Sequence, residues 1–334
     1  MRRGLILLAI FAALAAAPTV EAASWARPQI QIVVDRGLMG PTVAQFRAGQ
    51  PLTRGELGYA MAVLTQQEQV VVDPERAVTM AQLHRRLVTY LGLRSAAGKF
   101  RRTVANAGLN PPWRLGDETV ARLLRLRLNH PAEQDNLELR PNDPATRAEA
   151  AYSLARVLEL GQWDFDWVNS LADSFALPQL TAWRTRVLKR AVHFVGFPYI
   201  WGGIWEHQQT LFGVTDRGGF DCSGFVWRVY KLVPFDGGGS LSSVIQGRTT
   251  YQMSGEVPKS ARIARRYVKP ADVLFFGSAG PSSKPSQVDH TGIYLGGGWM
   301  IQSSGQGVTL APFSGWYVDR FAWARRPLRE AGLS

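Results

Sequence analysis

Before residue 196, apolar residues recur three to four positions apart in several separate stretches of the chain. This spacing is typical of helices that bury one face against a core. The stretches run over residues 57–64, 76–93, 150–158 and 181–195. The last one is expected to stop at Gly196, because glycine favours the conformation found at helix C-termini. The first half of the chain is therefore predicted to be mainly helical.

A short helix and a β-hairpin are predicted in the second half of the chain. Apolar residues recur at helical spacing after Asp221, so we interpret Asp221 as the N-cap and Cys222 as the first helical residue. Residues 291–295 and 299–303 are rich in β-branched and aromatic residues, and three glycines separate them. Two such runs joined by a glycine turn predict a hairpin.

The register of this hairpin decides which side chains share a face. If the turn is centred on Gly297, His290 and Gln302 are diagonal neighbours on one face, roughly 7–8 Å apart. A glutamine side chain reaches an imidazole ring over that distance. A shift of one residue would instead place the two side chains on opposite faces.

Two segments of the first half share a pattern. Residues 46–56 and 139–149 both contain a proline followed by Thr-Arg-x-Glu, and an apolar helix follows each. The threonine is an N-cap candidate, and the glutamate three residues later completes a capping box. The pattern indicates either two ordinary helix starts or an internal repeat. The helix predicted over 76–93 lacks the signature, so it is either a degenerate third copy or a packing helix.

The N-terminus has the pattern of an export signal. Two arginines precede an apolar run over residues 5–17, and residues 20–22 supply a small-residue cleavage site. The run is too short to cross a bilayer, so we interpret residues 1–23 as a secretory signal peptide, cleaved after Ala22 or Ala23. No second long apolar run follows. The mature protein is therefore expected to lack a transmembrane span and to be secreted to the cell wall or periplasm.

The formal net charge of +12 implies a polyanionic neighbour. For an exported protein, cell-wall polymers or anionic lipids fit this role more readily than nucleic acid. No basic cluster with interleaved aromatic residues marks a nucleic-acid groove, and the arginines are spread along the whole chain. The alternative is an arginine-rich composition on a solvated surface.

Cys222 is the only cysteine of the chain, so an internal disulfide is excluded. It is a buried apolar residue, half of an intermolecular bridge, or a nucleophile. Its place at a helix N-terminus favours a nucleophile, because the unpaired N–H groups and the helix dipole are expected to lower the pKa of the thiol. No cluster of His, Cys and Asp has metal-ligand spacing, so no metal or other cofactor is expected.

Five ordered segments of the second half resemble motifs of the NlpC/P60 family of papain-like cell-wall peptidases. They are residues 196–203, 220–226, 247–252, 270–276 and 289–296. The resemblance implies an α+β fold, in which a papain-like domain with a helix packed on an antiparallel sheet follows the helical region. It also implies an endopeptidase that cuts peptidoglycan stem peptides between D-glutamate and the following diamino acid.

The resemblance assigns roles to individual residues. Cys222 is the expected nucleophile, His290 the base and Gln302 the group that orients the ring, a place that histidine commonly holds in the family. Tyr199 and Ser223 match positions that line the substrate cleft. Asp221 either meets a free amino terminus of the stem peptide or acts only as the N-cap. His193 is expected to be structural, and His207 to lie in a surface loop, within an insertion over residues 204–218.

The repeated Thr-Arg-x-Glu segments resemble S-layer homology (SLH) modules, helical repeats that bind cell-wall glycopolymers. Arg54 and Arg147 match the basic residue of that motif, so they are either polymer-binding residues or partners of the glutamates. We therefore expect an SLH-like region over residues 24–160, a connector over 161–178 and the peptidase domain over 179–330. Two alternatives stay open: a non-catalytic wall-binding or scaffold protein, and an amidase or acyltransferase that uses the same Cys-His pair.

Overall fold

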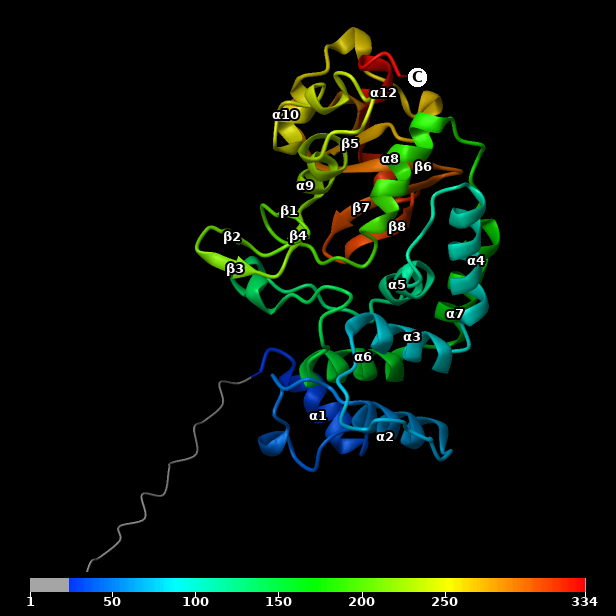
Figure 1. The fold of residues 1–334 in the computed structure, drawn as a ribbon, viewed down its shortest axis with the longest axis vertical. Coiled ribbons are helices and arrows are strands. Elements are labelled where there is room, and N and C mark those ends of the chain that lie inside the picture. Colours follow the sequence, from blue (N-terminus) through cyan, green and yellow to red (C-terminus); the bar gives the residue numbers. More distant parts are fainter. Residues whose placement is uncertain (1–23, 334) are drawn as a thin grey trace, which may run out of the picture.

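The computed structural model of the protein describes residues 24–333. The expected signal peptide, residues 1–23, lies outside the described residues. Within residues 24–333, no helix has the length and apolar character needed to cross a membrane. Helices fill the first half of the described chain and a five-stranded sheet lies in the second half (Figure 1). The α+β class expected from the sequence is confirmed.

The first half is built almost entirely from helices. They are α1 (Arg27–Asp35), α2 (Arg54–Thr65), α3 (Met80–Tyr90), α4 (Arg94–Asn106), α5 (Leu115–Leu123), α6 (Arg147–Glu159) and α7 (Gln162–Ser174). Helix α7 occupies most of the segment expected to be a connector, and it packs on α4. Just after it, the ring of Phe175 lies 5.2 Å from that of Phe100 and 4.8 Å from that of Trp299. This segment therefore packs between the helical region and the sheet.

Three short extended segments meet at the centre of the helical region. Leu52 N–H donates to the carbonyl of Ala145 at 2.8 Å, Ala145 N–H to Val78 at 2.8 Å, and Val78 N–H to Leu52 at 2.9 Å. A threonine N-cap follows each segment, and α2, α3 and α6 begin there. The segment before α3 is thus a structural equivalent of the two repeats, although it lacks their signature. Its relation to SLH modules stays a prediction.

The second half forms an antiparallel sheet with the strand order β8-β7-β6-β5-β9. The strands are β5 (Val273–Gly277), β6 (Val288–Gly296), β7 (Trp299–Ser304), β8 (Gly307–Pro312) and β9 (Phe321–Arg325). The helices of this half are α8 (Ala182–His193), α9 (Cys222–Trp227), α10 (Thr250–Gly255), α11 (Trp316–Arg320) and α12 (Pro327–Glu330). Helix α9 packs on β6 and β7, which gives the helix-on-sheet arrangement that the sequence predicts.

Two small antiparallel pairs lie between α8 and α9. One joins β1 (Ile204–Trp205) to β4 (Gly219–Phe220), and the other joins β2 (Gln209–Leu211) to β3 (Val214–Asp216). The insertion over residues 204–218 is therefore an ordered hairpin rather than a plain surface loop. It packs on the short helix η2 (Ala132–Leu137) of the helical region.

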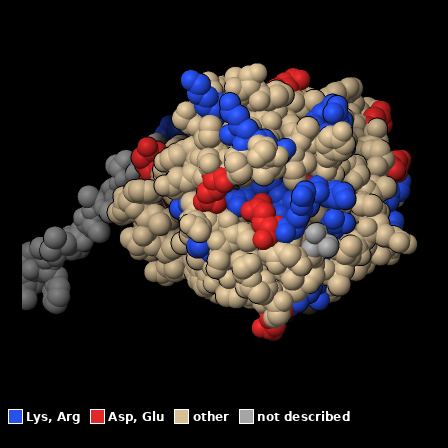
Figure 2. Space-filling model, turned by 90° about the horizontal axis from the view of Figure 1, so that it is seen from above, with Lys and Arg blue, Asp and Glu red and all other residues tan. Residues whose placement is uncertain are grey.

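Charged residues are unevenly spread over the surface. In the view onto the end of the molecule that carries α10 and α12, Lys and Arg side chains gather near the middle of the face, with a few carboxylates among them (Figure 2). Residues 259–269 carry five Lys and Arg residues, and the fold brings this segment beside α12 at the same end.

Buried ionic side chains join the helical region to the start of the second half. The guanidinium group of Arg114 donates to the carbonyls of Val195 at 3.1 Å and His193 at 2.7 Å. The guanidinium group of Arg122 donates to the carbonyls of Gly196 and Gln306. Arg122 is 2% exposed, so the two halves meet through polar contacts closed to water.

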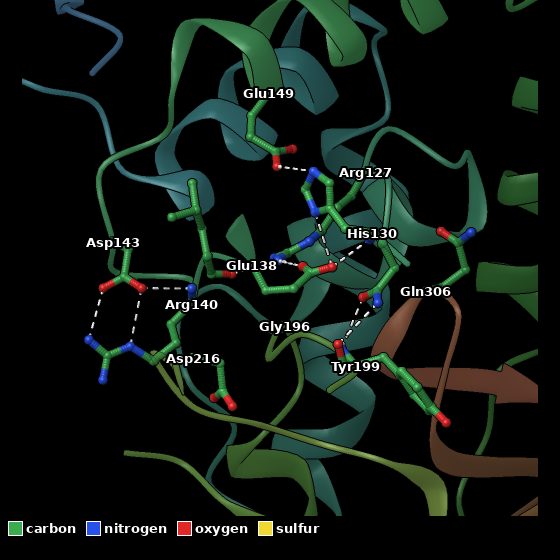
Figure 3. A network of polar contacts seen from close by, with 12 residues as sticks. Arg127, His130, Glu138, Arg140, Asp143, Glu149, Gly196, Tyr199, Asp216 and Gln306 are labelled. Carbon is green, nitrogen blue, oxygen red and sulfur yellow. Dashed lines mark hydrogen bonds and ion pairs between the residues drawn. The ribbon is translucent and has the colours of Figure 1, made fainter. Parts of the chain in front are cut away.

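A second buried network lies beside this junction (Figure 3). Arg127 pairs with Glu138 at 2.9 Å, and Glu138 also accepts the backbone N–H of His130 at 2.6 Å. The ring of His130 lies 3.7 Å from the carboxylate of Glu149, and burial raises the pKa of Glu149 to about 7. These contacts hold the segment over residues 127–138, which includes η2 and extends toward Tyr199 in the second half.

Candidate active site

Cys222 lies at the first residue of α9, as the sequence predicts. The side chain of Asp221 accepts the backbone N–H of Gly224, which makes Asp221 the N-cap of the helix. A side chain at Gly224 would collide with the carbonyl of Gly203, so α9 and the loop before β1 approach as closely as only glycine allows. Cys222 is 9% exposed and is a free thiol.

The expected lowering of the thiol pKa is wrong. Burial raises the pKa of Cys222 to about 12, and the carboxylate of Asp221 adds to this rise. The backbone N–H groups of Thr291 and Ser223 and the charge of Arg248 act in the opposite direction without overcoming it. Loss of hydration therefore outweighs the helix N-terminus at this position. Because Thr291 lies on β6 directly after His290, this N–H contact also places the sulfur beside β6.

The hairpin register matches the prediction. Ile293 pairs with Ile301 across β6 and β7, which centres the turn on residue 297 and makes His290 and Gln302 diagonal neighbours. The ring Nε2 of His290 lies in hydrogen-bond contact with Oε1 of Gln302. Because an amide oxygen only accepts, Nε2 donates the hydrogen, and the lone pair of the neutral ring stays on Nδ1. Burial lowers the pKa of His290, while the bond to Gln302 partly opposes this.

Tyr317 completes this chain of contacts, and sequence reasoning missed it. Its hydroxyl accepts a hydrogen from the amide nitrogen of Gln302, so Oε1 of Gln302 faces the imidazole. Tyr317 belongs to α11, where Trp316 also lies with its ring 6.4 Å from that of His290. The sequence carries no spacing signal for this contact, because α11 lies beyond β8.

Arg248 is a second residue that the sequence did not single out. Its guanidinium group pairs with Asp221 at 2.9 Å, donates to the hydroxyl of Ser223 at 2.6 Å and to the carbonyl of Gly202 at 2.8 Å. Two of the predicted substrate-binding residues, Asp221 and Ser223, are therefore brought together. The carboxylate of Asp221 is already paired with a cation.

Tyr199 lies near the thiol and is held by the helical region. Asn129 accepts the backbone N–H of Tyr199 and donates to its carbonyl, both at 3.0 Å. Two residues further on, Asp135 accepts the backbone N–H of Trp201 at 3.0 Å. Burial raises the pKa of the Tyr199 phenol, and the neighbouring charge of Cys222 contributes to the rise. Side chains of the helical region thus hold the backbone around Tyr199 in the second half of the chain.

The other predicted residues lie outside this group. His193 is exposed at the end of α8, and the exposed ring of His207 packs near Trp205 in the insertion. Arg54 pairs with Asp73 at 3.5 Å. Arg147 donates to the carbonyl of Phe46 at 2.6 Å and pairs with Glu56 of the other copy, not with the glutamate of its own repeat. Within residues 24–333, no group of His, Cys, Asp and Glu side chains has the arrangement of a metal site.

The model of the NlpC/P60 family matches residues 196–326. This part of the chain is an NlpC/P60 domain. The match begins three residues after the end of α8 and includes the thiol, the imidazole and the amide described above. The helical region before it lies outside the match, so its function is not assigned by this family.

Several curated proteins are similar to the chain. The murein DD-endopeptidase MepH of Escherichia coli is 32% identical over 44% of this chain and 46% of its own length. The bifunctional muramidase/DL-endopeptidase CwlT of Bacillus subtilis is 30% identical over 40% of this chain and 33% of its own length. The γ-D-glutamyl-L-lysine dipeptidyl-peptidase of Bacillus subtilis is 25% identical over 42% of this chain and 38% of its own length. The chain thus spans less than half the length of each.

Proposed function

We propose that the protein is a secreted cysteine endopeptidase that hydrolyses a peptide bond in peptidoglycan stem peptides. The observation that carries this proposal is the hydrogen bond between His290 and Gln302, because His290 lies on β6 directly before Thr291, whose backbone N–H contacts the sulfur of Cys222. The names of two similar proteins, a murein DD-endopeptidase and a γ-D-glutamyl-L-lysine dipeptidyl-peptidase, support this class of substrate.

The proposed reaction gives each of the three side chains one role. The sulfur of Cys222 attacks the carbonyl carbon of the scissile bond while His290 takes the thiol proton. The backbone N–H of Cys222 stabilises the resulting oxyanion, together with one further donor. His290 then gives the proton to the leaving amine, which leaves an acyl-enzyme. Water, deprotonated by the same imidazole, releases the acid and restores the thiol. Gln302 holds the ring orientation throughout.

We further propose that the bond cut is the one between D-glutamate and the following diamino acid. Tyr199, Asp221 and Ser223 are the proposed substrate-binding residues, because Tyr199 lies beside the thiol and Arg248 gathers the other two. A free amino terminus on the stem peptide would bind the carboxylate of Asp221 in competition with Arg248. The similar proteins bear names for different bonds, so the bond itself needs a direct assay.

Defined muropeptides test both parts of the proposal. The full chain without residues 1–23 is incubated with each peptide, and the products are weighed by mass spectrometry. Cleavage should produce a new amino terminus at the diamino acid, and both Cys222→Ala and His290→Ala should abolish it. His207→Ala is the matched control and should keep full activity. Activity that survives Cys222→Ala would refute the proposal, and transfer products in place of hydrolysis would make the protein an acyltransferase.

The proposed wall anchor is the helical region, in which three extended segments meet before α2, α3 and α6. We propose that it binds an anionic wall glycopolymer through Arg54 and Arg147, although both guanidinium groups already contact carboxylates. The test is sedimentation of the full chain with wall sacculi before and after their secondary polymers are removed. Arg54→Gln should weaken sedimentation with intact sacculi only, and Arg36→Gln, just after α1, is the charge-matched control. Equal binding to both kinds of sacculi would refute glycopolymer binding.

A further inference from the structure

The loop between α10 and β5 carries an unusual density of positive charge. Five cations and no carboxylate lie within residues 259–269. The loop is not free in space, because Ile263 exchanges two backbone hydrogen bonds with Ala324 of β9, at 3.0 and 2.9 Å. The sheet therefore holds these charges in a fixed place on the surface.

A cavity of about 670 Å³ lies between this loop and α12. Arg262, Arg326 and Arg329 line it together with Tyr267, and none of its lining residues belongs to the proposed active site. It lies at the end of the molecule that Figure 2 shows, where Lys and Arg side chains gather. The cavity brings cations of the loop and of the last helix to one place.

The carboxylates at this cavity are already occupied. Glu256 binds Arg325 at 2.7 Å, and Glu330 binds the same guanidinium group, which is 3% exposed. Arg326, which lines the cavity, is itself paired with the buried Asp272 at 2.8 Å. Among residues 24–333, by contrast, Lys259, Arg262, Arg265, Arg266, Lys269 and Arg329 form no ion pair.

Arg262 shows how the loop cations are prepared for a ligand. Its guanidinium carbon lies 3.5 Å from the centre of the Trp323 ring. Trp323 is only 2% exposed, so the guanidinium group rests on a side chain that is itself held in place. A guanidinium group held in one plane loses less freedom when it binds a phosphate through two parallel hydrogen bonds. Arg265 and Arg266 are exposed on the same loop and extend the positive surface beyond the cavity.

We infer that this cavity and the adjoining loop bind a phosphate-bearing polymer chain, at a place separate from both the thiol and the helical repeats. Several cations without partners favour a ligand with several charges over a single ion, because each contact adds to the same binding event. A concave surface fits a chain that enters it, whereas a flat bilayer would contact only its rim. The inference does not depend on the peptidase activity.

The probe is fluorescently labelled poly(glycerol phosphate), and binding to the full chain without residues 1–23 is followed by anisotropy at fixed salt. The cavity variant removes one cation that lines the cavity and two on the adjoining loop, Arg265→Gln/Arg266→Gln/Arg329→Gln, whose three side chains are exposed and form no ion pair in the described chain. We expect its affinity to fall by about tenfold or more, since three surface charge contacts are lost together. Arg262→Gln alone should lower the affinity by severalfold.

The control removes the same charge elsewhere. Arg36→Gln/Arg125→Gln/Arg217→Gln changes three exposed arginines elsewhere in the described chain, and it should alter the affinity less than about twofold. Thermal unfolding of all variants checks that each remains folded. Equal losses in the cavity and control variants would show attraction by net charge alone and overturn the inference. Tight binding to phosphatidylglycerol vesicles without binding to the polymer would also overturn it, since the ligand would then be a lipid surface.

Discussion

The thiol of Cys222 should be unreactive at neutral pH in the protein without substrate. Burial raises its pKa from the usual 9.0 to about 12. At pH 7 an ordinary thiol of pKa 9 is about 1% thiolate, whereas one of pKa 12 is about 0.001% thiolate, a thousandfold decrease. The thiolate is the species that reacts with alkylating agents. Reaction of Cys222 with iodoacetamide should therefore be at least about a hundredfold slower in the native protein than in the unfolded one.

The pH profile distinguishes a raised pKa from simple inaccessibility. The alkylation rate is measured by mass spectrometry from pH 5 to 10, for the native protein and for the protein in denaturant. We expect the native rate to rise about tenfold per pH unit over the whole range, because the thiolate fraction does so below the pKa. Inaccessibility alone would lower the rate equally at each pH. A plateau below pH 7 would refute the reasoning, because it would indicate a thiolate already paired with the imidazolium of His290.

Four further outcomes are expected. Gln302→Ala should lower kcat by about ten- to a thousandfold, since the imidazole loses its orienting partner, while Gln302→His should retain measurable activity. Tyr317→Phe should lower kcat less, because it removes only the contact that holds the amide; a variant with unchanged kcat would contradict that role. Asn129→Ala should raise KM more than it lowers kcat, because it releases the backbone of Tyr199, and Asn129→Asp should recover part of the loss. The raised pKa of Cys222 stabilises the folded state, fully below pH 9, and this contribution is lost as the pH rises toward 12. Between pH 8 and 10, the free energy of unfolding measured in urea should therefore fall by roughly 1–2 kcal/mol more in the native protein than in Cys222→Ala.

Local signals in the sequence were sufficient for the parts of the site that are close along the chain. The glycine turn fixes the register that brings His290 beside Gln302, and Asp221, as the N-cap, fixes the start of α9. Contacts between distant residues left no such signal. Asn129 and Tyr199 are separated by 70 positions, and nothing in either segment indicates that an amide will bind that backbone.

Burial explains the prediction that failed. A sequence shows that a cysteine begins a helix, and from this the effect of the helix N-terminus on the pKa can be inferred. It does not show how closely the surrounding segments pack over the sulfur. In the structure β6 lies against the start of α9, and the loss of hydration is larger than the stabilisation offered by the N–H groups of Ser223 and Thr291.

The neutral amide of Gln302 is consistent with the direction of both pKa shifts at the site. A carboxylate in its place would stabilise the imidazolium and favour transfer of the thiol proton before any substrate binds. Gln302 orients the ring without that charge, and burial lowers the pKa of His290 while it raises that of Cys222. Both shifts keep the proton on sulfur in the free protein. Proton transfer is then expected to accompany the attack on a bound carbonyl, which would protect the thiol from oxidation until its substrate is in place.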